Sequence, residues 1–403
     1  MKYRLLFLIL FTSGFVFSQK IIKGTAYSQK GPLEDAVVYV NNTSIGTTTN
    51  NKGEFSLSVK EGTSELIISY LGFKTINYPI NTKTYTKPLT FALLENENIL
   101  EEIIIEKTKY DENWKYNLSL FKNAFIGKTE LSANCILLNP KVLHFDFDSK
   151  QRKLTATAKE PIQIKNNGLG YKITYDLKKF VIHNNKVTYL GYSRYENLDG
   201  NKRKKQRWKK NRIKAYKGSQ IHFYKTLINN STYEEGFIVD QFKRLSNPDR
   251  PKEVEIKEAR KLVVLAKVNL NLSKKITPPK TAIDSALVVL RKSRLPKYKD
   301  YLYRSNVPLK EVIRKKSGYF YLDFKDNLRV VYTREKEEKG YISRNPLNRK
   351  REPSFQTSSL TPIQMPSMID KKGILLSPLD LLYEGYWSYE KFANSLPLDY
   401  IPD

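Results

Sequence analysis

Short segments of alternating apolar and polar residues, each ended by turn residues, fill the chain between residues 20 and 95. β-Branched and aromatic residues dominate these segments, and turns such as 50–53 separate them. Strands this short and this closely spaced predict two small antiparallel sheets packed face to face. We therefore expect an all-β, seven-stranded sandwich over residues 19–97. Its strands are expected at Ile21–Ala26, Ala36–Val40, Gly46–Thr49, Gly53–Val59, Glu65–Tyr70, Phe73–Tyr78 and Leu89–Leu93.

The motifs within these segments are specific enough to identify a family. They are Gly24-Thr25-Ala26 and the runs 32–40, 46–50, 53–57 and 68–73. Together they closely resemble the carboxypeptidase regulatory-like domain of Bacteroidetes envelope proteins. The resemblance implies a prealbumin-like fold. It also implies an accessory role without catalysis, because the domain accompanies carboxypeptidases and precedes the plug of outer-membrane receptors.

The first 18 residues have the layout of a signal peptide. Lys2 and Arg4 precede an apolar run that begins at Leu5 and ends near Ser18. That run is shorter than the roughly 20 apolar residues that a membrane span needs. We expect cleavage after Ser18, export to the periplasm or outer-membrane periphery, and no transmembrane span in the mature chain. Cys135 is the only cysteine and lies in an apolar run, so we interpret it as a core residue and not as a lipid anchor.

A linker strand is expected over residues 98–111, because the segment 99–107 resembles the strand that joins this domain to a receptor plug. The remaining residues are too few for a plug and barrel, and they do not alternate as barrel strands do. We therefore reject a receptor.

Residues 112–403 mix helical and strand patterns, which predicts an α+β domain with an antiparallel sheet. The spacing of Trp114, Leu118, Phe121 and Phe125 predicts a helix over 112–126. Strand patterns between 142 and 192 predict a meander of about six strands, and residues 319–332 predict a hairpin turned at Asp326-Asn327. The region resembles the uncharacterised remainder of similar envelope proteins, a resemblance that carries no known activity.

Charge is the strongest functional signal. The chain has 70 Lys and Arg against 41 Asp and Glu, a net charge of +29, and residues 202–217 hold ten of the basic side chains. This segment contains no helix breaker, and a helical stripe continues past Gly218 to Ile228. It is either a solvated charged face or a surface that binds anions. The candidate binding residues are Lys204, Lys205, Arg207, Lys210 and Arg212.

Familiar catalytic motifs are absent from the sequence. A zinc carboxypeptidase needs a His-x-x-Glu pair, and neither His144, His183 nor His222 has a glutamate three residues later. No nucleotide-binding or nucleophile-elbow motif occurs, and no cofactor or metal is expected. Glycoside hydrolysis remains an alternative, because the fold could bring together two of the scattered carboxylates. His144 and Asp146 could likewise form an acid–base pair, because both lie on one face of a predicted strand. The carboxylates in question are Glu160, Asp176, Glu196 and Asp240.

The sequence thus favours a non-catalytic binding or scaffolding protein of the cell envelope. Export directs its positive charge toward lipopolysaccharide phosphates, anionic lipids or acidic glycan, and away from nucleic acid. Another envelope protein is a possible further partner. The alternative is a hydrolase of envelope glycan or peptide that uses the sandwich as an accessory module.

Overall fold

The computed structural model describes residues 19–96, 109–267, 278–316, 319–344 and 351–402. The expected signal peptide lies outside these residues, as does nearly all of the expected linker strand over 98–111. The described chain is mostly β, with antiparallel sheets and a β-rich N-terminal domain. None of its described helices combines the length and the apolar character needed to cross a membrane.

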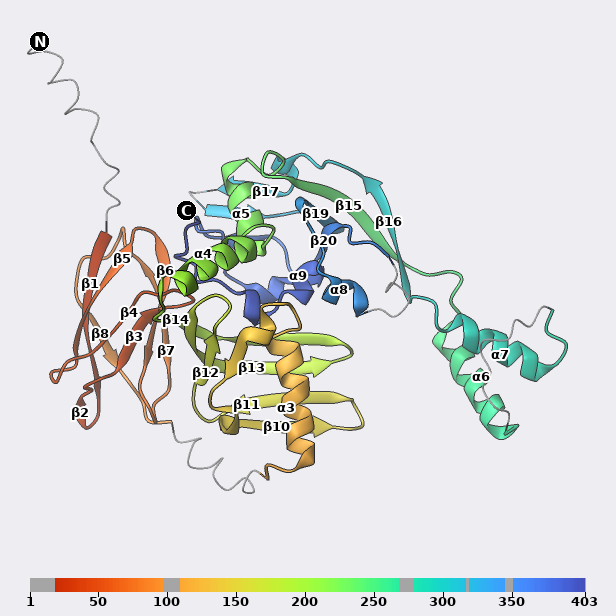
Figure 1. Ribbon diagram of the computed structural model, residues 1–403, viewed down its shortest axis with the longest axis horizontal. Coiled ribbons are helices and arrows are strands. Elements are labelled where there is room, and N and C mark those ends of the chain that lie inside the picture. Colours follow the sequence, from red (N-terminus) through yellow and green to blue (C-terminus); the bar gives the residue numbers. More distant parts are fainter. Residues whose placement is uncertain (1–18, 97–108, 268–277, 317–318, 345–350, 403) are drawn as a thin grey trace, which may run out of the picture.

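The N-terminal domain, at the left of Figure 1, is a sandwich of two four-stranded sheets within residues 19–96. One sheet has the order β2-β1-β5, with β8 parallel to β1, and the other has the order β4-β3-β6-β7. Each of the seven expected segments overlaps a strand, and the two-residue β2 makes the described strands eight and not seven. The strands are β1 (Gln19–Ser28), β2 (Gly31–Pro32), β3 (Val37–Val40), β4 (Gly46–Thr48), β5 (Glu54–Lys60), β6 (Thr63–Ser69), β7 (Ile76–Asn81) and β8 (Leu89–Ala92).

Strict alternation explains the sandwich. In β5, Phe55, Leu57 and Val59 are buried while the residues between them are exposed. Because successive side chains of a strand point to opposite faces, this pattern buries one face of the sheet and exposes the other to solvent. The buried faces of both sheets form one apolar core that includes Ile22 and Ile68.

A six-stranded antiparallel sheet and one helix form the next layer of the described chain. The sheet order is β10-β11-β13-β12-β9, with β14 beside β13, so it is not a simple meander. Helix α3 confirms the predicted helix, and it buries Phe121 and Phe125 against this sheet. The elements are α3 (Glu112–Phe125), β9 (Cys135–Leu137), β10 (Leu143–Asp148), β11 (Lys153–Ala158), β12 (Ile162–Asn166), β13 (Tyr171–His183) and β14 (Lys186–Asn197).

Two helices, α4 (Lys202–Tyr216) and α5 (Gln220–Asn229), follow where the sequence predicted one continuous helix. That prediction is wrong because Gly218 adopts a positive φ of 74° and ends the first helix. Ser219 then caps α5, since its side chain accepts a hydrogen bond from the backbone of His222. The chain therefore turns between a basic helix and a largely buried one.

A second core of the described chain is built on a five-stranded sheet of order β16-β15-β19-β20-β22 and a three-stranded sheet of order β17-β18-β21. The hairpin predicted over 319–332 is wrong, because β18 and β19 belong to different sheets. The strands are β15 (Phe237–Ser246), β16 (Tyr298–Arg304), β17 (Ile313–Lys316), β18 (Tyr319–Leu322), β19 (Asn327–Lys336), β20 (Phe355–Pro362), β21 (Ser367–Ile369) and β22 (Leu381–Gly385).

Four further α-helices lie in the described part of this region, beside short 3-10 turns. Two of them, α6 (Glu253–Leu265) and α7 (Ala282–Lys292), pack on each other at the end of the β15–β16 ribbon, far from the sandwich (Figure 1). The others are the short α8 (Lys339–Ser343) and α9 (Tyr386–Tyr389).

The sandwich is joined to the rest of the protein by hydrogen bonds from its loops. The Ser44 hydroxyl donates to the Asp399 carboxylate at 2.5 Å, and the Thr75 hydroxyl donates to Asp176 at 2.8 Å. The Leu398 backbone donates to the Asn42 carbonyl at 2.8 Å. The C-terminal segment thus lies between the sandwich and the six-stranded sheet, where residues 392–396 also enter the core beneath α3.

Candidate functional site

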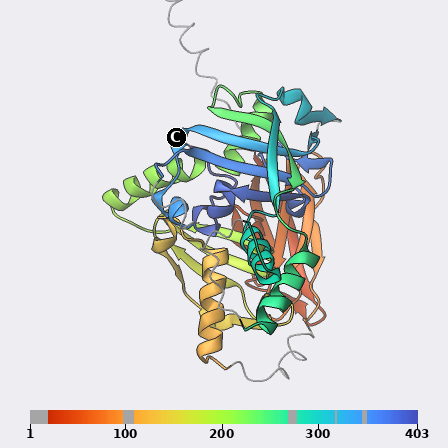
Figure 2. The same ribbon diagram turned by 90° about the vertical axis from the view of Figure 1, so that its right-hand side faces the viewer.

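Helix α4, which carries the predicted binding residues, is held to the body by one aromatic side chain. Trp208 is 5 % exposed, and its indole nitrogen donates to the Asn167 carbonyl at 2.8 Å. Gly170 allows this approach, since a Cβ there would lie 2.3 Å from the indole. In Figure 2 this lime-green helix lies at the left-hand margin of the molecule. The helix therefore has one docked face and one outer face.

Arg212 belongs to the docked face. Its Nε donates to the Leu169 carbonyl at 2.7 Å, and one terminal nitrogen donates to the Asn197 side chain at 3.0 Å. The guanidinium also lies 3.9 Å from the centre of the Tyr171 ring. Arg212 therefore fixes the helix and does not present its charge outward, so we leave it out of the proposed surface.

The other four predicted residues, Lys204, Lys205, Arg207 and Lys210, are exposed. Lys214 at the far end of α4 pairs with Glu130 at 3.2 Å, whereas these four form no ion pair with any described residue. Their charge is therefore available to a ligand.

Helical spacing adds a residue that the sequence prediction missed. Residues separated by four and three positions share one side of a helix that turns by about 100° per residue. Arg203, Arg207 and Lys210 have this spacing, opposite the buried Trp208, and Arg203 is exposed. Lys204 and Lys205 are four and three positions before Trp208, so they lie nearer its side of the helix, but they are exposed at the first turn. We call Arg203, Lys204, Lys205, Arg207 and Lys210 the basic face.

The start of α4 is electrostatically unfavourable for a free helix. Its first four residues, 202–205, are all basic, and the N-terminus of a helix already carries partial positive charge. A charge of the wrong sign in the first turn typically costs about 0.3–1 kcal/mol. A bound anion would relieve this repulsion.

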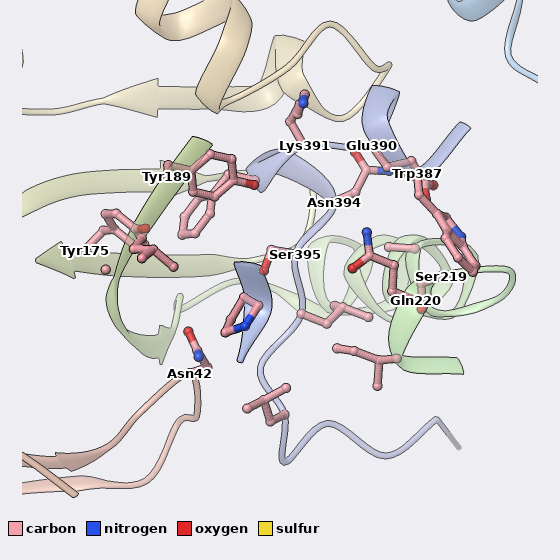
Figure 3. A pocket seen from close by; sticks show the side chains of 18 residues that line it. Asn42, Tyr175, Tyr189, Ser219, Gln220, Trp387, Glu390, Lys391, Asn394 and Ser395 are labelled. Atoms are coloured by element: carbon pink, nitrogen blue, oxygen red, sulfur yellow. Dashed lines mark hydrogen bonds between the residues drawn. The ribbon is translucent and has the colours of Figure 1, made fainter. Parts of the chain in front are cut away.

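A cavity of about 320 Å³ lies where the sandwich, the six-stranded sheet and the C-terminal segment meet. Figure 3 shows its lining, with the polar ends of Tyr189, Gln220 and Ser395 turned toward its middle and Asn42 at the sandwich side. Burial, reinforced by nearby Glu338 and Glu335, raises the pKa of Glu390 in this lining to about 8. Glu390 is therefore mainly protonated at neutral pH.

Only two of the four carboxylates considered for glycoside hydrolysis lie in the same cleft. Glu160 and Asp176 line one wide cleft of about 1100 Å³ between the sandwich and the six-stranded sheet. Glu196 pairs with Arg194 at 2.6 Å, and Asp240 is held by Arg329 at 2.7 Å in another sheet. The four carboxylates therefore do not form one site.

The histidines and the cysteine lie on four different elements: Cys135 on β9, His144 on β10, His183 on β13 and His222 on α5. His222 is buried, and its Nδ1 accepts a hydrogen bond from the Gly218 backbone at 3.1 Å. Burial lowers the pKa of His222 to about 4, and burial raises the pKa of the Cys135 thiol to about 12. Both groups are therefore neutral at pH 7. Among the described residues, no cluster of His, Cys, Asp and Glu side chains could hold a metal ion.

Comparison with known proteins bears on the N-terminal module. A search of the curated proteins found no match to this chain. The model of the CarboxypepD_reg-like domain family matches residues 22–105, which supports the domain resemblance read from the sequence.

Proposed function

We propose that the protein is a non-catalytic binding or scaffolding protein of the cell envelope, whose basic face on α4 binds anionic envelope components. The observation that carries this proposal is the outward-facing row Arg203, Arg207 and Lys210, which has no carboxylate partner among the described residues. Each Lys or Arg held near an anionic lipid surface contributes about 1 kcal/mol. The row alone thus favours such a surface by about 3 kcal/mol.

We propose the domain boundaries that the sequence predicts. Residues 1–18 are a signal peptide, 19–97 a prealbumin-like module, 98–111 a linker strand and 112–403 an α+β domain. The protein is exported to the periplasm or outer-membrane periphery of a Bacteroidetes-type cell. Its partner is lipopolysaccharide, anionic lipid or acidic glycan, with another envelope protein as a further partner. Nucleic acid is not a partner in this proposal, and no cofactor is required.

The binding experiment uses the mature protein, residues 19–403, with purified lipopolysaccharide and with peptidoglycan across a salt series. The test variant is Arg203→Gln/Arg207→Gln/Lys210→Gln. The matched control, Lys257→Gln/Arg260→Gln/Lys261→Gln, removes the same charge from exposed positions of α6. Trp208 and Arg212 are untouched, so both variants should fold.

We expect the α4 variant to bind about 100-fold more weakly at low salt, and the α6 control to bind nearly as the wild type does. Binding of the wild type should weaken as salt screens the charges. Equal losses in the two variants would show that only net charge matters and would overturn the proposed site. No binding to either preparation would overturn the function.

The alternative, a hydrolase of envelope glycan or peptide, would use the cleft that Glu160 and Asp176 share. Against it, Asp176 accepts a hydrogen bond from Thr75 and pairs with Lys178 at 2.8 Å, so it holds the sandwich in place. Turnover of peptidoglycan fragments that disappears in Glu160→Gln would establish the hydrolase.

A further inference from the structure

The cavity at the junction of the three regions has walls that are already fixed by hydrogen bonds. The Asn42 side chain accepts from the Ser193 hydroxyl at 2.6 Å, and Ser395 bonds to the Tyr195 hydroxyl at 2.7 Å. On the opposite side, the Trp387 indole donates to the Gly218 carbonyl at 2.7 Å. Such a cavity needs little rearrangement to accept a ligand.

Several polar groups of the lining have no hydrogen-bond partner in the part of the chain that the structure describes. Tyr175 is only 3 % exposed, yet its hydroxyl forms no hydrogen bond with a described residue, and neither does that of Tyr189 or the side-chain amide of Gln220. Figure 3 shows both hydroxyls on the cavity side of their rings. Polar groups in a cavity wall that have no such partner are free to bond to water or to a ligand.

The chemistry of the lining is neutral and mixed. Hydroxyls and amides both donate and accept hydrogen bonds, whereas aromatic rings offer flat apolar surface. Glu390 is mainly protonated at neutral pH, and Lys391 directs its amine away from the other labelled groups (Figure 3). This combination suits a ligand that carries many hydroxyls on a compact apolar frame and has no net charge.

The size of the cavity limits the ligand further. A volume of about 320 Å³ corresponds to roughly ten water molecules at about 30 Å³ each. One sugar ring with its hydroxyls fits that space.

We propose that this cavity binds one uncharged sugar ring, a hexose or an N-acetylhexosamine, through the hydroxyls of Tyr175 and Tyr189 and the amide of Gln220. Because Asn42 closes one side, the sandwich is a structural part of this site. The proposal is independent of the basic face, which recognises negative charge and lies on the outer side of α4, whereas Ala215 on the docked side of that helix lines the cavity.

The test uses variants that keep the fold. Tyr175→Phe/Tyr189→Phe removes two hydroxyls that have no described protein partner but preserves the ring contacts with Phe125 at 5.0 and 5.1 Å. Gln220→Ala removes the amide, and Tyr116→Phe in α3, where the tyrosine is 64 % exposed, is the matched control. Thermal unfolding of each variant without sugar checks that it is folded.

Calorimetric titration with glucose, galactose, mannose and N-acetylglucosamine up to about 10 mM supplies the measurement. We expect at least one sugar to bind, with affinity that does not change with salt. The double tyrosine variant and Gln220→Ala should each bind about tenfold more weakly, and Tyr116→Phe should bind as the wild type does. No binding of any sugar would overturn the proposal, and so would binding that the cavity variants retain.

Salt separates this proposal from the function proposed above. Cavity binding is expected to persist at high salt and in the α4 triple variant, whereas binding of anionic envelope components is not. Either proposal can therefore fail while the other stands.

Discussion

The Arg212 guanidinium lies 3.9 Å from the centre of the Tyr171 ring and donates hydrogen bonds to the backbone turn that precedes that tyrosine. A side chain from the most basic segment of the chain therefore acts as a structural clamp. It joins helix α4 to the turn between β12 and β13 of the six-stranded sheet, and the basic face depends on it for its position.

Replacing Arg212 by glutamine should destabilise the protein by about 2 kcal/mol, because backbone hydrogen bonds and a cation–π contact are lost together. Arg207→Gln, which removes the same charge from an exposed position five residues earlier, should change stability by less than about 0.5 kcal/mol. Chemical denaturation of the two variants measures the difference. Equal stability would mean that Arg212 does not hold the helix.

The approach of Trp208 to Gly170 gives a second test. Gly170 has a φ of +75°, and an added Cβ would lie 2.3 Å from the indole. Gly170→Ala should therefore cost about 3 kcal/mol or more, which combines backbone strain with overpacking.

Gly72→Ala is the matched control for this substitution. Gly72 has a similar φ of +85°, but no atom lies within 4 Å of the added Cβ. It should cost only the backbone strain of about 1 kcal/mol. The difference in free energy of unfolding between the two variants isolates the contact with Trp208, and a difference near zero would contradict it.

Local patterns explain the parts of the fold that the sequence predicted well. Helix α3 spans Glu112–Phe125 against a predicted 112–126, because one aromatic stripe on a helix needs no knowledge of its partner. The sandwich strands are predictable for the same reason, because the alternation of apolar and polar residues within one strand indicates which of its faces is buried. Both signals are contained in fewer than about 15 consecutive residues.

Pairing between strands that are distant in the sequence explains why the predicted hairpin over 319–332 is wrong. Strands β18 and β19 follow each other closely, and Asp326 adopts the positive φ of a tight turn between them. β18 nevertheless pairs with β21, and β19 pairs with β15 and β20. No local pattern contains such partners, so the hairpin was a reasonable but wrong prediction.

Of the two candidate sites, the basic helix has a local sequence signal and the cavity has none. Charge density located α4, but it could not distinguish the docked Arg212 from the exposed Arg203. A signal was available, since Trp208, Arg212 and Ala215 share one side of a helix. The sugar cavity had no such signal, because its lining combines Asn42, Tyr175 and Gln220 from three separate regions.

Acid should weaken the protein through His222. Burial lowers the pKa of His222 to about 4 in the folded protein, whereas it stays near 6.5 in the unfolded chain. The unfolded chain therefore binds a proton first as the pH falls, and stability is lost between about pH 6.5 and pH 4. The contribution of His222 to this loss should reach about 2–3 kcal/mol.

Denaturation at several pH values checks this prediction with two variants. His222→Gln should remove most of the loss over that range, although it lowers stability at neutral pH. His183→Gln, at an exposed position of β13, should leave the loss unchanged. Because Glu390 changes stability in the opposite direction over the same range, the loss is measured in a Glu390→Gln background, where a profile that is flat from pH 6.5 to pH 4 would contradict a neutral buried His222.

Glu390 should produce the opposite dependence at higher pH. Burial, together with Glu338 and Glu335, raises its pKa from 4.5 to about 8 in the folded protein. Between these values the folded protein holds a proton that the unfolded chain releases, so stability falls as the pH rises toward 8. Glu390→Gln removes this dependence and should stabilise the protein by about 2 kcal/mol or more near pH 8.

The exposed Glu352→Gln is the matched control and should have no such effect in thermal unfolding at about pH 5 and about pH 8. If Glu390→Gln were instead less stable than the wild type near pH 8, the carboxylate would have to be ionised and paired in the folded protein.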